Sequence, residues 1–214
     1  MATTFDTVII DYGMGNLRSV EKAVEAVGGH PLISGDPQAV KSAGRLILPG
    51  VGAFGDAMEN LRRQGLDGAI RQAAGAGTPL LGLCLGLQLL FTESEEFGNH
   101  EGLNLIPGKV RKFEGPGLRV PHVGWNQIEA IRPNPLLKDI AEGSYFYFVH
   151  SYYVEPDSPQ DALCWTAYGR RFCSIACRGS VWGAQFHPEK SQSSGRLLLR
   201  NFLGVGPEQT KHYL

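Results

Sequence analysis

Residues 80–93 read LLGLCLGLQLLFTE, an apolar run with a cysteine between two glycines. Leu80–Cys84 has the length and apolarity of a strand that is buried on both faces, and a helix is predicted over about Leu87–Glu93. The GLCLG segment at residues 82–86 lies between them and matches a nucleophile elbow with cysteine in place of serine. Glycines relieve crowding in so sharp a turn, so we expect the Cys84 sulfur to be lifted out of the sheet toward a cleft.

The predicted elbow also supplies the electrostatics that a nucleophilic cysteine needs. A helix N-terminus directly after Cys84 favours the thiolate, because the exposed N–H groups there stabilise negative charge. The backbone N–H of Leu85 would point into the same site as an oxyanion donor. A lone cysteine in an apolar run is more often a packed core residue, but the paired glycines between a strand and a helix favour a nucleophile.

The chain before this stretch alternates strands and helices. Predicted strands cover Thr7–Asp11, Pro31–Ser34 and Arg45–Leu48, and predicted helices cover Asn16–Val27, Met58–Leu61 and Leu66–Ala74. Asn16 is placed to cap the first helix. Alternation with short connections predicts parallel strands joined by right-handed crossovers, with helices on both faces of the sheet.

The second half of the chain changes character. It contains strand-like segments joined by turns and then a final helix: Val110–Phe113, Gln127–Ile131, Tyr145–Val154, Leu163–Tyr168, Phe172–Phe186 and the helix Gly195–Leu203. The whole pattern predicts an α/β fold with an open, mostly parallel, flavodoxin-like sheet flanked by helices, to which antiparallel strands are added in the second half. We expect one domain over residues 1–214, with its site at the carboxyl ends of the strands.

Composition excludes several classes of protein. The 214 residues carry 20 Lys and Arg against 21 Asp and Glu, so no basic field attracts nucleic acid. The longest apolar stretch, residues 79–91, is shorter than the ~18 residues of a membrane-spanning helix. The first residues, MATTFDTVIID, lack the basic start of a secretory signal, so we expect a cytoplasmic protein whose four cysteines form no disulfide. No metal site or cofactor is expected.

A second motif, QFHPE at residues 185–189, offers a base for Cys84. A nucleophilic cysteine needs a group that takes its proton and returns it to the leaving amine, and His187 suits that role. Glu189 lies two residues further on, so in extended backbone it would share a side with His187 and orient the imidazole. His-Pro-Glu alone would more often be an ordinary turn, but with an elbow cysteine it completes a nucleophile–base–orienter set.

A third motif, PGVGAFG at residues 49–55, follows the strand Arg45–Leu48. It contains the glycine spacing of a dinucleotide-binding loop, but it follows the third strand, and no acidic residue ends a strand about 20 positions later. A glycine-rich loop beside the elbow has a better use, because its free N–H groups supply a second oxyanion donor and its lack of side chains lets substrate approach.

These three motifs, in this order, resemble the class I (triad) glutamine amidotransferase family, and the likeness covers essentially the whole chain. Further segments resemble the glutaminase subunits of imidazole glycerol phosphate synthases, which act in histidine biosynthesis: DYGMGNLRSV (11–20), PHVGWN (121–126), YFVHSYY (147–153) and HPEKS (187–191). The resemblance implies that the Cys84 thiolate attacks the side-chain amide of glutamine, with the N–H groups of Val51 and Leu85 holding the oxyanion. It also implies glutamine-binding residues, namely Gly50, Gly52, Gln88, Glu96, His150, Ser151 and Tyr152.

Simpler roles stay open for some of these residues. Gln88 is one turn past the nucleophile and could satisfy only backbone groups, Glu96 could be a solvated charge, and His150 lies in a tyrosine-rich strand that more often packs than binds. The resemblance further implies a partner, a TIM-barrel cyclase that receives the ammonia and forms a heterodimer with this chain. We expect Met14, Asn16 and Trp125 at that interface, although core packing is an equal alternative for Trp125.

Three other functions compete with this interpretation. The chain could be the glutaminase subunit of another ammonia-using synthase, a cysteine hydrolase of peptides or esters, or a non-catalytic binding subunit with the same fold. Activation by one specific partner would distinguish the glutaminase of this synthase from that of another. Turnover without any partner would indicate the cysteine hydrolase. The third is disfavoured because all three triad positions carry competent residues, Cys84, His187 and Glu189.

Overall fold

The computed structural model describes residues 6–130 and 132–204. Five strands of a twelve-stranded sheet are parallel and have the order β2-β1-β3-β4-β14. These strands are β1 (Thr7–Ile10), β2 (Pro31–Ser34), β3 (Arg45–Leu48), β4 (Leu80–Leu83) and β14 (Val181–Ala184). The strand that precedes Cys84 thus lies between β3 and β14, inside the sheet, and its burial on both faces is confirmed.

The sheet continues from β14 through strands that are mostly antiparallel, in the order β13-β11-β7-β5-β6, with β12 and β9 alongside β13. Their bounds are β5 (Phe91–Ser94), β6 (His100–Glu101), β7 (Ile106–Lys112), β9 (Glu129–Ala130), β11 (Tyr152–Pro156), β12 (Ala162–Tyr168) and β13 (Arg170–Arg178). Two strands, β8 (His122–Gln127) and β10 (Tyr145–His150), form a separate antiparallel ribbon. The predicted fold class is confirmed.

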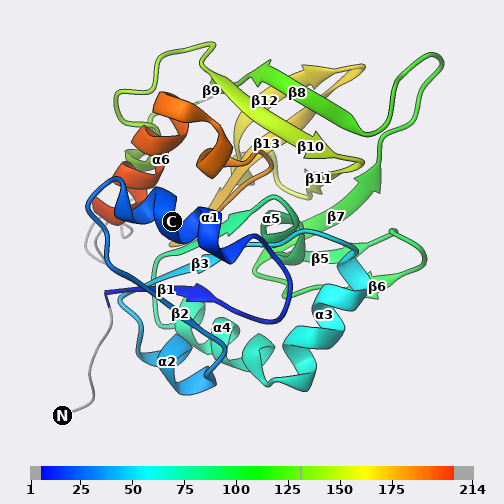
Figure 1. The fold of residues 1–214 in the computed structure, drawn as a ribbon. Helices are drawn as coiled ribbons and strands as arrows, with labels where there is room; N and C mark the ends of the chain where they lie inside the picture. The colour runs from blue at the N-terminus through cyan, green and yellow to red at the C-terminus, as the bar shows by residue number, and fades with distance from the viewer. Residues whose placement is uncertain (1–5, 131, 205–214) are drawn as a thin grey trace.

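Helices cover both faces of the sheet (Figure 1). On one side lie α1 (Leu17–Glu25) and α6 (Gln192–Gly204), and on the other lie α2 (Pro37–Ser42), α3 (Phe54–Arg63) and α4 (Leu66–Gly75). Strand β1 shows how the sequence sorts the two cores. Val8 and Ile10 pack on the side of α2, α3 and α4, whereas Ile9 points toward α1 and α6, because side chains alternate along a strand. No helix within the described ranges is long and apolar enough to cross a membrane.

The cap predicted for α1 is present. The Asn16 side chain accepts a hydrogen bond of 3.3 Å from the backbone N–H of Ser19, and Val20 and Val24 on the next turns are buried. Capping satisfies an N–H group that has no partner inside the helix, so Asn16 has a structural task in this chain.

Two local predictions were wrong. The helix expected over about Leu87–Glu93 is a single short helix, α5 (Leu85–Leu89), and the chain then enters β5. Residues 91–94 are strand because they pair with β7 on one side and β6 on the other, and sheet pairing overrides the local apolar pattern. The helix α2 was missed, although Asp36 accepts from the N–H of Gln38 at its start and Pro37 occupies its first turn.

Some segments that the sequence predicts as single strands are each divided into two strands in the structure. Gln127–Ile131 covers the end of β8 and the short strand β9, and Ile131 itself lies outside the described residues. The predicted strands Tyr145–Val154 and Phe172–Phe186 are likewise each two strands, β10 with β11 and β13 with β14. The break between β13 and β14 is at Gly179, whose φ of 57° marks a turn that the prediction passed over, whereas the break between β10 and β11 is at Ser151 and has no glycine or proline.

The carboxyl ends of four parallel strands meet at one edge of the sheet. The residues that follow these ends are Tyr12 after β1, Pro49–Val51 after β3, Cys84 after β4 and Gln185–His187 after β14. All three sequence motifs therefore come together at the edge where open α/β sheets bind ligands.

Candidate active site

A cavity of about 350 Å³ lies at this edge. Most of the residues predicted for catalysis and glutamine binding line it: Val51, Gly52, Cys84, Leu85, Gln88, Glu96, His150, Ser151, Tyr152 and His187. Pro121, Val149 and Lys190, which were not predicted, complete the wall. Two predicted residues do not line the cavity: Glu189, which contacts His187, and Gly50, which is buried in the loop after β3. The size is that of a pocket for a small molecule.

Cys84 sits in a strained turn, as the elbow pattern predicts. Its φ of 54° lies in the left-handed region that side chains rarely adopt, and 7% of the residue is exposed. A Cβ on Gly86 would overlap the carbonyl oxygen of Leu48, and one on Gly82 would lie 2.6 Å from the carbonyl oxygen of Gly86. The two glycines are therefore required by the close approach of backbone around the cysteine.

His187 and Glu189 form the predicted pair. The Nδ1 of His187 lies 2.8 Å from Oε1 of Glu189, and their side chains are 5% and 3% exposed. The geometry differs from the extended backbone that we expected, because Pro188–Lys190 forms a 3-10 turn. Ser191 secures this turn, since its hydroxyl donates to the carbonyl of His187 and accepts from the N–H of Tyr147 on β10.

The carboxylate fixes the state of the imidazole. Because a carboxylate oxygen accepts, Nδ1 of His187 carries a proton, which leaves Nε2 to exchange a proton in the cavity. Among the described residues, Nε2 has no hydrogen-bond partner, and neither does Oε2 of Glu189. Burial by itself lowers the pKa of His187, but the nearby Cys84 sulfur and the Glu189 carboxylate outweigh it and raise the pKa to about 9.

This pKa predicts how glutamine turnover depends on pH. Below a pH of about 9, His187 keeps the proton that a leaving amine needs, and above it that proton is lost, so kcat/KM is expected to fall on the alkaline side. Initial rates between about pH 6 and pH 10 measure this limb. In Glu189→Gln the limb is expected at lower pH, because one of the two groups that raise the pKa is gone. An alkaline limb that does not move in this variant would contradict the assignment.

The sulfur of Cys84 contacts two polar groups in the cavity wall. Its thiol donates to the carbonyl of Val149 and accepts from Nε2 of Gln185, each over 3.9 Å. Oε1 of Gln185 accepts from Nε2 of Gln88 at 3.2 Å, and this same Nε2 donates to the carbonyl of Tyr152 at 3.1 Å. Gln88 thus connects the elbow with β11. Gln185 was missed as a functional residue, although it stands directly after a buried strand in the same motif as His187.

Glu96 is half-buried, and it is not only a solvated charge. It accepts a hydrogen bond of 2.7 Å from the N–H of Phe54 at the start of α3, and burial raises the pKa of its carboxyl. In the loop after β3, Gly52 has a φ of 108°, and Val51 is 46% exposed at the cavity wall. Its neighbour Gly50 packs so closely that a Cβ there would lie 2.5 Å from the hydroxyl of Tyr12.

Tyr12 is a second residue that the sequence motifs did not reveal. Its side chain is fully buried, and its hydroxyl donates to the carbonyl of Pro49 over 2.9 Å. Burial raises the pKa of Tyr12 well above the ordinary range, and the Cys84 sulfur acts in the same direction, so the hydroxyl keeps its proton. Tyr12 therefore anchors the glycine-rich loop from below. Tyr12 lies in the DYG segment at residues 11–13. A tyrosine at the end of an apolar strand is typical of a core residue, so nothing in the sequence assigns it a role in the site.

The residues expected at a partner interface lie outside the cavity. Trp125 on β8 is 46% exposed, so the alternative of core packing is wrong for it. It faces Tyr147 across the ribbon, with ring centroids 6.0 Å apart. Met14 is half-buried against the core beside Gly52, and Asn16 is exposed at the start of α1.

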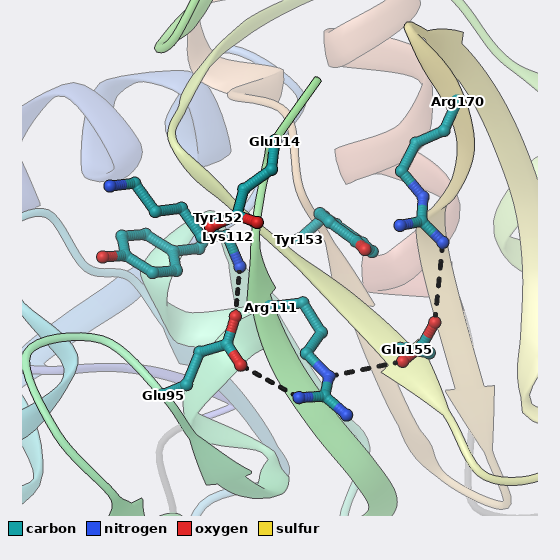
Figure 2. Close-up of a pocket in the computed structure, with 8 residues that line it drawn as sticks. All are labelled: Glu95, Arg111, Lys112, Glu114, Tyr152, Tyr153, Glu155 and Arg170. Atoms are coloured by element: carbon teal, nitrogen blue, oxygen red, sulfur yellow. Dashed lines mark hydrogen bonds and ion pairs between the residues drawn. The ribbon is translucent and has the colours of Figure 1, made fainter. Parts of the chain in front are cut away.

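A larger cavity of about 510 Å³ is also lined by Tyr152 and contains none of the triad (Figure 2). Its side chains are mostly charged, and they pair with one another. Arg111 reaches Glu95 at 2.9 Å and Glu155 at 3.5 Å, and Arg170 lies 3.7 Å from the same Glu155. Because its charges are mutually compensated and solvent-exposed, we assign the chemistry to the smaller cavity around Cys84.

The comparison with known families agrees with this geometry. The family described as "Glutamine amidotransferase class-I" matches residues 4–204. The chain is 52% identical over 201 residues to "Imidazole glycerol phosphate synthase subunit HisH" of Syntrophotalea carbinolica, covering 91% of this chain and 98% of that protein. The protein of the same name from Moorella thermoacetica is 51% identical, with coverage of 91% and 92%. The chain belongs to the class I glutamine amidotransferase family, in its HisH group. It is a glutamine amidotransferase, as the resemblance implied.

Two solved structures share the fold at low sequence identity. "Structure of PurLQS from Thermotoga maritima" aligns with a TM-score of 0.74 at 18% identity, covering 94% of this chain and 98% of that one. "Crystal structure of glutamine amidotransferase" aligns with a TM-score of 0.73 at 18% identity, with coverage of 94% and 100%. At such identities the likeness concerns the fold alone.

Proposed function

We propose that this amidotransferase is the glutaminase subunit of an imidazole glycerol phosphate synthase, with Cys84, His187 and Glu189 as its triad. The supporting observation is the cysteine at the strained end of β4, in one cavity with a histidine that a buried carboxylate holds at 2.8 Å. The choice of synthase is supported by the relatives, which are named subunit HisH of imidazole glycerol phosphate synthase. Residues 1–214 act as a single amidotransferase domain in this proposal.

The reaction proceeds in two steps. The Cys84 thiolate attacks the side-chain amide carbon of glutamine, and the resulting oxyanion accepts from the N–H groups of Val51 and Leu85. His187 gives its proton to the departing nitrogen, so that ammonia leaves and a glutamyl thioester remains. Water then attacks the thioester, His187 takes the water's proton and returns it to the sulfur, and glutamate is released. Glu189 keeps the imidazole oriented throughout.

Glutamine is held by the remaining wall of the cavity. Glu96 offers a carboxylate for its α-amino group, while Gly50 and Gly52 keep the loop after β3 compact enough for substrate to approach the elbow. His150, Ser151 and Tyr152 form the opposite wall, with Gln88 between this wall and the sulfur. A pocket of this size accommodates an amino acid of glutamine's dimensions.

The partner is a TIM-barrel cyclase that uses the ammonia to make imidazole glycerol phosphate and aminoimidazole carboxamide ribotide. Ammonia released into water becomes ammonium, which cannot attack, so a synthase must receive it directly. Met14, Asn16 and Trp125 contact this partner, together with the exposed Val123, which lies beside Trp125 on the same face of β8. A cytoplasmic location, where all four cysteines stay reduced, completes the proposal.

Trp125 provides a direct test of the interface. Exposed tryptophans anchor interfaces, and truncating one costs about 2 kcal/mol or more, so Trp125→Ala is expected to raise the Kd for the cyclase by about 30-fold. Titration calorimetry measures this Kd. Phe97→Ala is the control, because this aromatic residue is 84% exposed in the segment between β5 and β6 and is not on the β8–β10 ribbon. Equal Kd values for Trp125→Ala and the unaltered chain would contradict the interface.

The whole proposal is tested by glutamate release from the purified chain, alone and with the cyclase and its nucleotide ligand. A rate that rises sharply with the cyclase supports the glutaminase of this synthase. A rate that does not change when the cyclase is added would indicate the glutaminase of another synthase. Turnover of peptides or esters without any partner would indicate a general hydrolase. Absence of glutamate release under both conditions refutes the proposal.

A further inference from the structure

Two buried histidines join the β8–β10 ribbon to the wall of the glutamine cavity. Nδ1 of His122 on β8 lies 2.9 Å from Nε2 of His150 on β10, and Nδ1 of His150 lies 2.7 Å from the carbonyl oxygen of Tyr152. At the other end, Nε2 of His122 lies 3.3 Å from Nδ2 of Asn126. The four residues form an unbroken chain of polar contacts.

The groups at both ends of this hydrogen-bond chain fix the position of every ring proton in it. The oxygen of Asn126 is identified because it accepts from the N–H of Gln127 at 2.8 Å, and its Nδ2 donates to the carbonyl of Ala167 at 2.9 Å. Nδ2 is therefore a donor, so Nε2 of His122 must be bare and the ring's hydrogen must be on Nδ1. That hydrogen faces Nε2 of His150, which must also be bare.

The opposite end gives the same answer independently. A carbonyl oxygen only accepts, so Nδ1 of His150 must carry the hydrogen that it donates to Tyr152, and its Nε2 must accept from His122. Each ring is thus neutral and carries its hydrogen on Nδ1. A proton added to His150 would set two N–H groups against each other, and one added to His122 would face the amide of Asn126.

The surroundings hold the rings in this arrangement. His122 is 3% exposed and is stacked between Tyr168, at 3.9 Å between ring centroids, and Phe148, at 4.9 Å. His150 is 6% exposed and meets the edge of Phe113 at 5.2 Å. Burial lowers the pKa of His122 to about 4 and that of His150 to about 3, which agrees with neutral rings.

The last acceptor in the chain belongs to the active site. The carbonyl of Tyr152 receives hydrogen bonds from His150 and from Gln88, and Gln88 also donates to Gln185, which contacts the sulfur of Cys84. His122 itself does not line the cavity. We infer that His122 is a positioning residue for glutamine binding, because its Nδ1–H locks the orientation of His150 and, through it, the Tyr152 wall of the pocket. This inference rests on the proposed glutaminase function.

Two substitutions separate the role of Nδ1–H from simple packing. In His122→Asn the side-chain amide takes the place of Nδ1 and can still donate to His150. In His122→Gln the amide takes the place of Nε2, so the donor to His150 is lost. With the holoenzyme complex, His122→Gln is expected to raise the KM for glutamine at least about tenfold with kcat changed less than about threefold, because a buried acceptor is left unpaired. His122→Asn is expected to keep KM within about threefold of the unaltered protein.

Nitrogen NMR of 15N-histidine-labelled chain tests the proton positions without any turnover. Both His122 and His150 are expected as neutral Nδ1–H tautomers, and His150 is expected to lose this pure state in His122→Gln but not in His122→Asn. The exposed His30, as His30→Gln, is the control substitution. An Nε2–H tautomer at either ring, or an equal KM for the two His122 variants, would overturn the inference. If the unaltered complex releases no glutamate, the proposed function fails, and the spectra still decide the proton positions.

Discussion

Replacing Cys84 with alanine is expected to lower glutamate release by about 10⁶-fold, the loss that follows removal of the nucleophile from a comparable triad. No other group can form the thioester: the remaining cysteines, Cys164, Cys173 and Cys177, are at most 2% exposed, and burial raises the pKa of each thiol. Coupled detection of glutamate in the presence of the cyclase measures the rate. The variant is expected to bind glutamine still, although it releases almost no glutamate.

The matched control is Cys164→Ala, which removes a thiol of the same kind from a site away from the cavity. Its turnover is expected to stay near that of the unaltered chain while the protein is folded. Alkylation gives a second readout, because an electrophilic glutamine analogue should modify Cys84 alone. Undiminished glutamate release by Cys84→Ala would exclude this residue as the nucleophile.

The second large effect concerns how much kcat falls when each of the other two triad members is removed. His187→Ala is expected to lower kcat by about 10⁶-fold, because the same group gives and takes the proton, whereas Glu189→Ala is expected to cost about 10⁴-fold. The difference arises because Glu189 acts through His187, which it holds at 2.8 Å, and does not touch the reacting atoms. Single-turnover formation of the thioester in both variants measures the ranking.

Folding must be checked for this comparison, since Glu189→Ala leaves a buried Nδ1 without its partner. Near-ultraviolet circular dichroism and the urea midpoint of both variants provide that check. Equal and complete loss in a stably folded Glu189→Ala protein would contradict the ranking and would mean that orientation matters as much as proton transfer.

The sequence carried the elements that depend on local pattern. The elbow could be predicted because GLCLG joins an apolar strand to a helix start, and the glycines are explained by backbone contacts at Gly82 and Gly86. The pairing of His187 with Glu189 was also predicted, but the reason given was wrong, since a 3-10 turn and not extended backbone brings the two side chains together. Short spacing limits distance even when the backbone conformation is misjudged.

Long-range features could not be read from the sequence. The Phe91–Ser94 segment looks helical in isolation and is a strand only because β6 and β7 flank it. Gln185, Tyr12 and His122 act through partners far away in the chain, such as Tyr12 through Pro49, 37 positions on. Such partners are set by strand order, which alternating hydrophobicity does not encode.

The central claim is that the amide nitrogen of glutamine passes from Cys84 chemistry to the cyclase. The most direct test supplies the complex with amide-15N glutamine, the cyclase's nucleotide substrate and an excess of unlabelled ammonium, and measures 15N in the imidazole glycerol phosphate formed. We predict that the product carries the label, and that Cys84→Ala yields only unlabelled product. Release of glutamate with an unlabelled product from the unaltered complex would contradict the account.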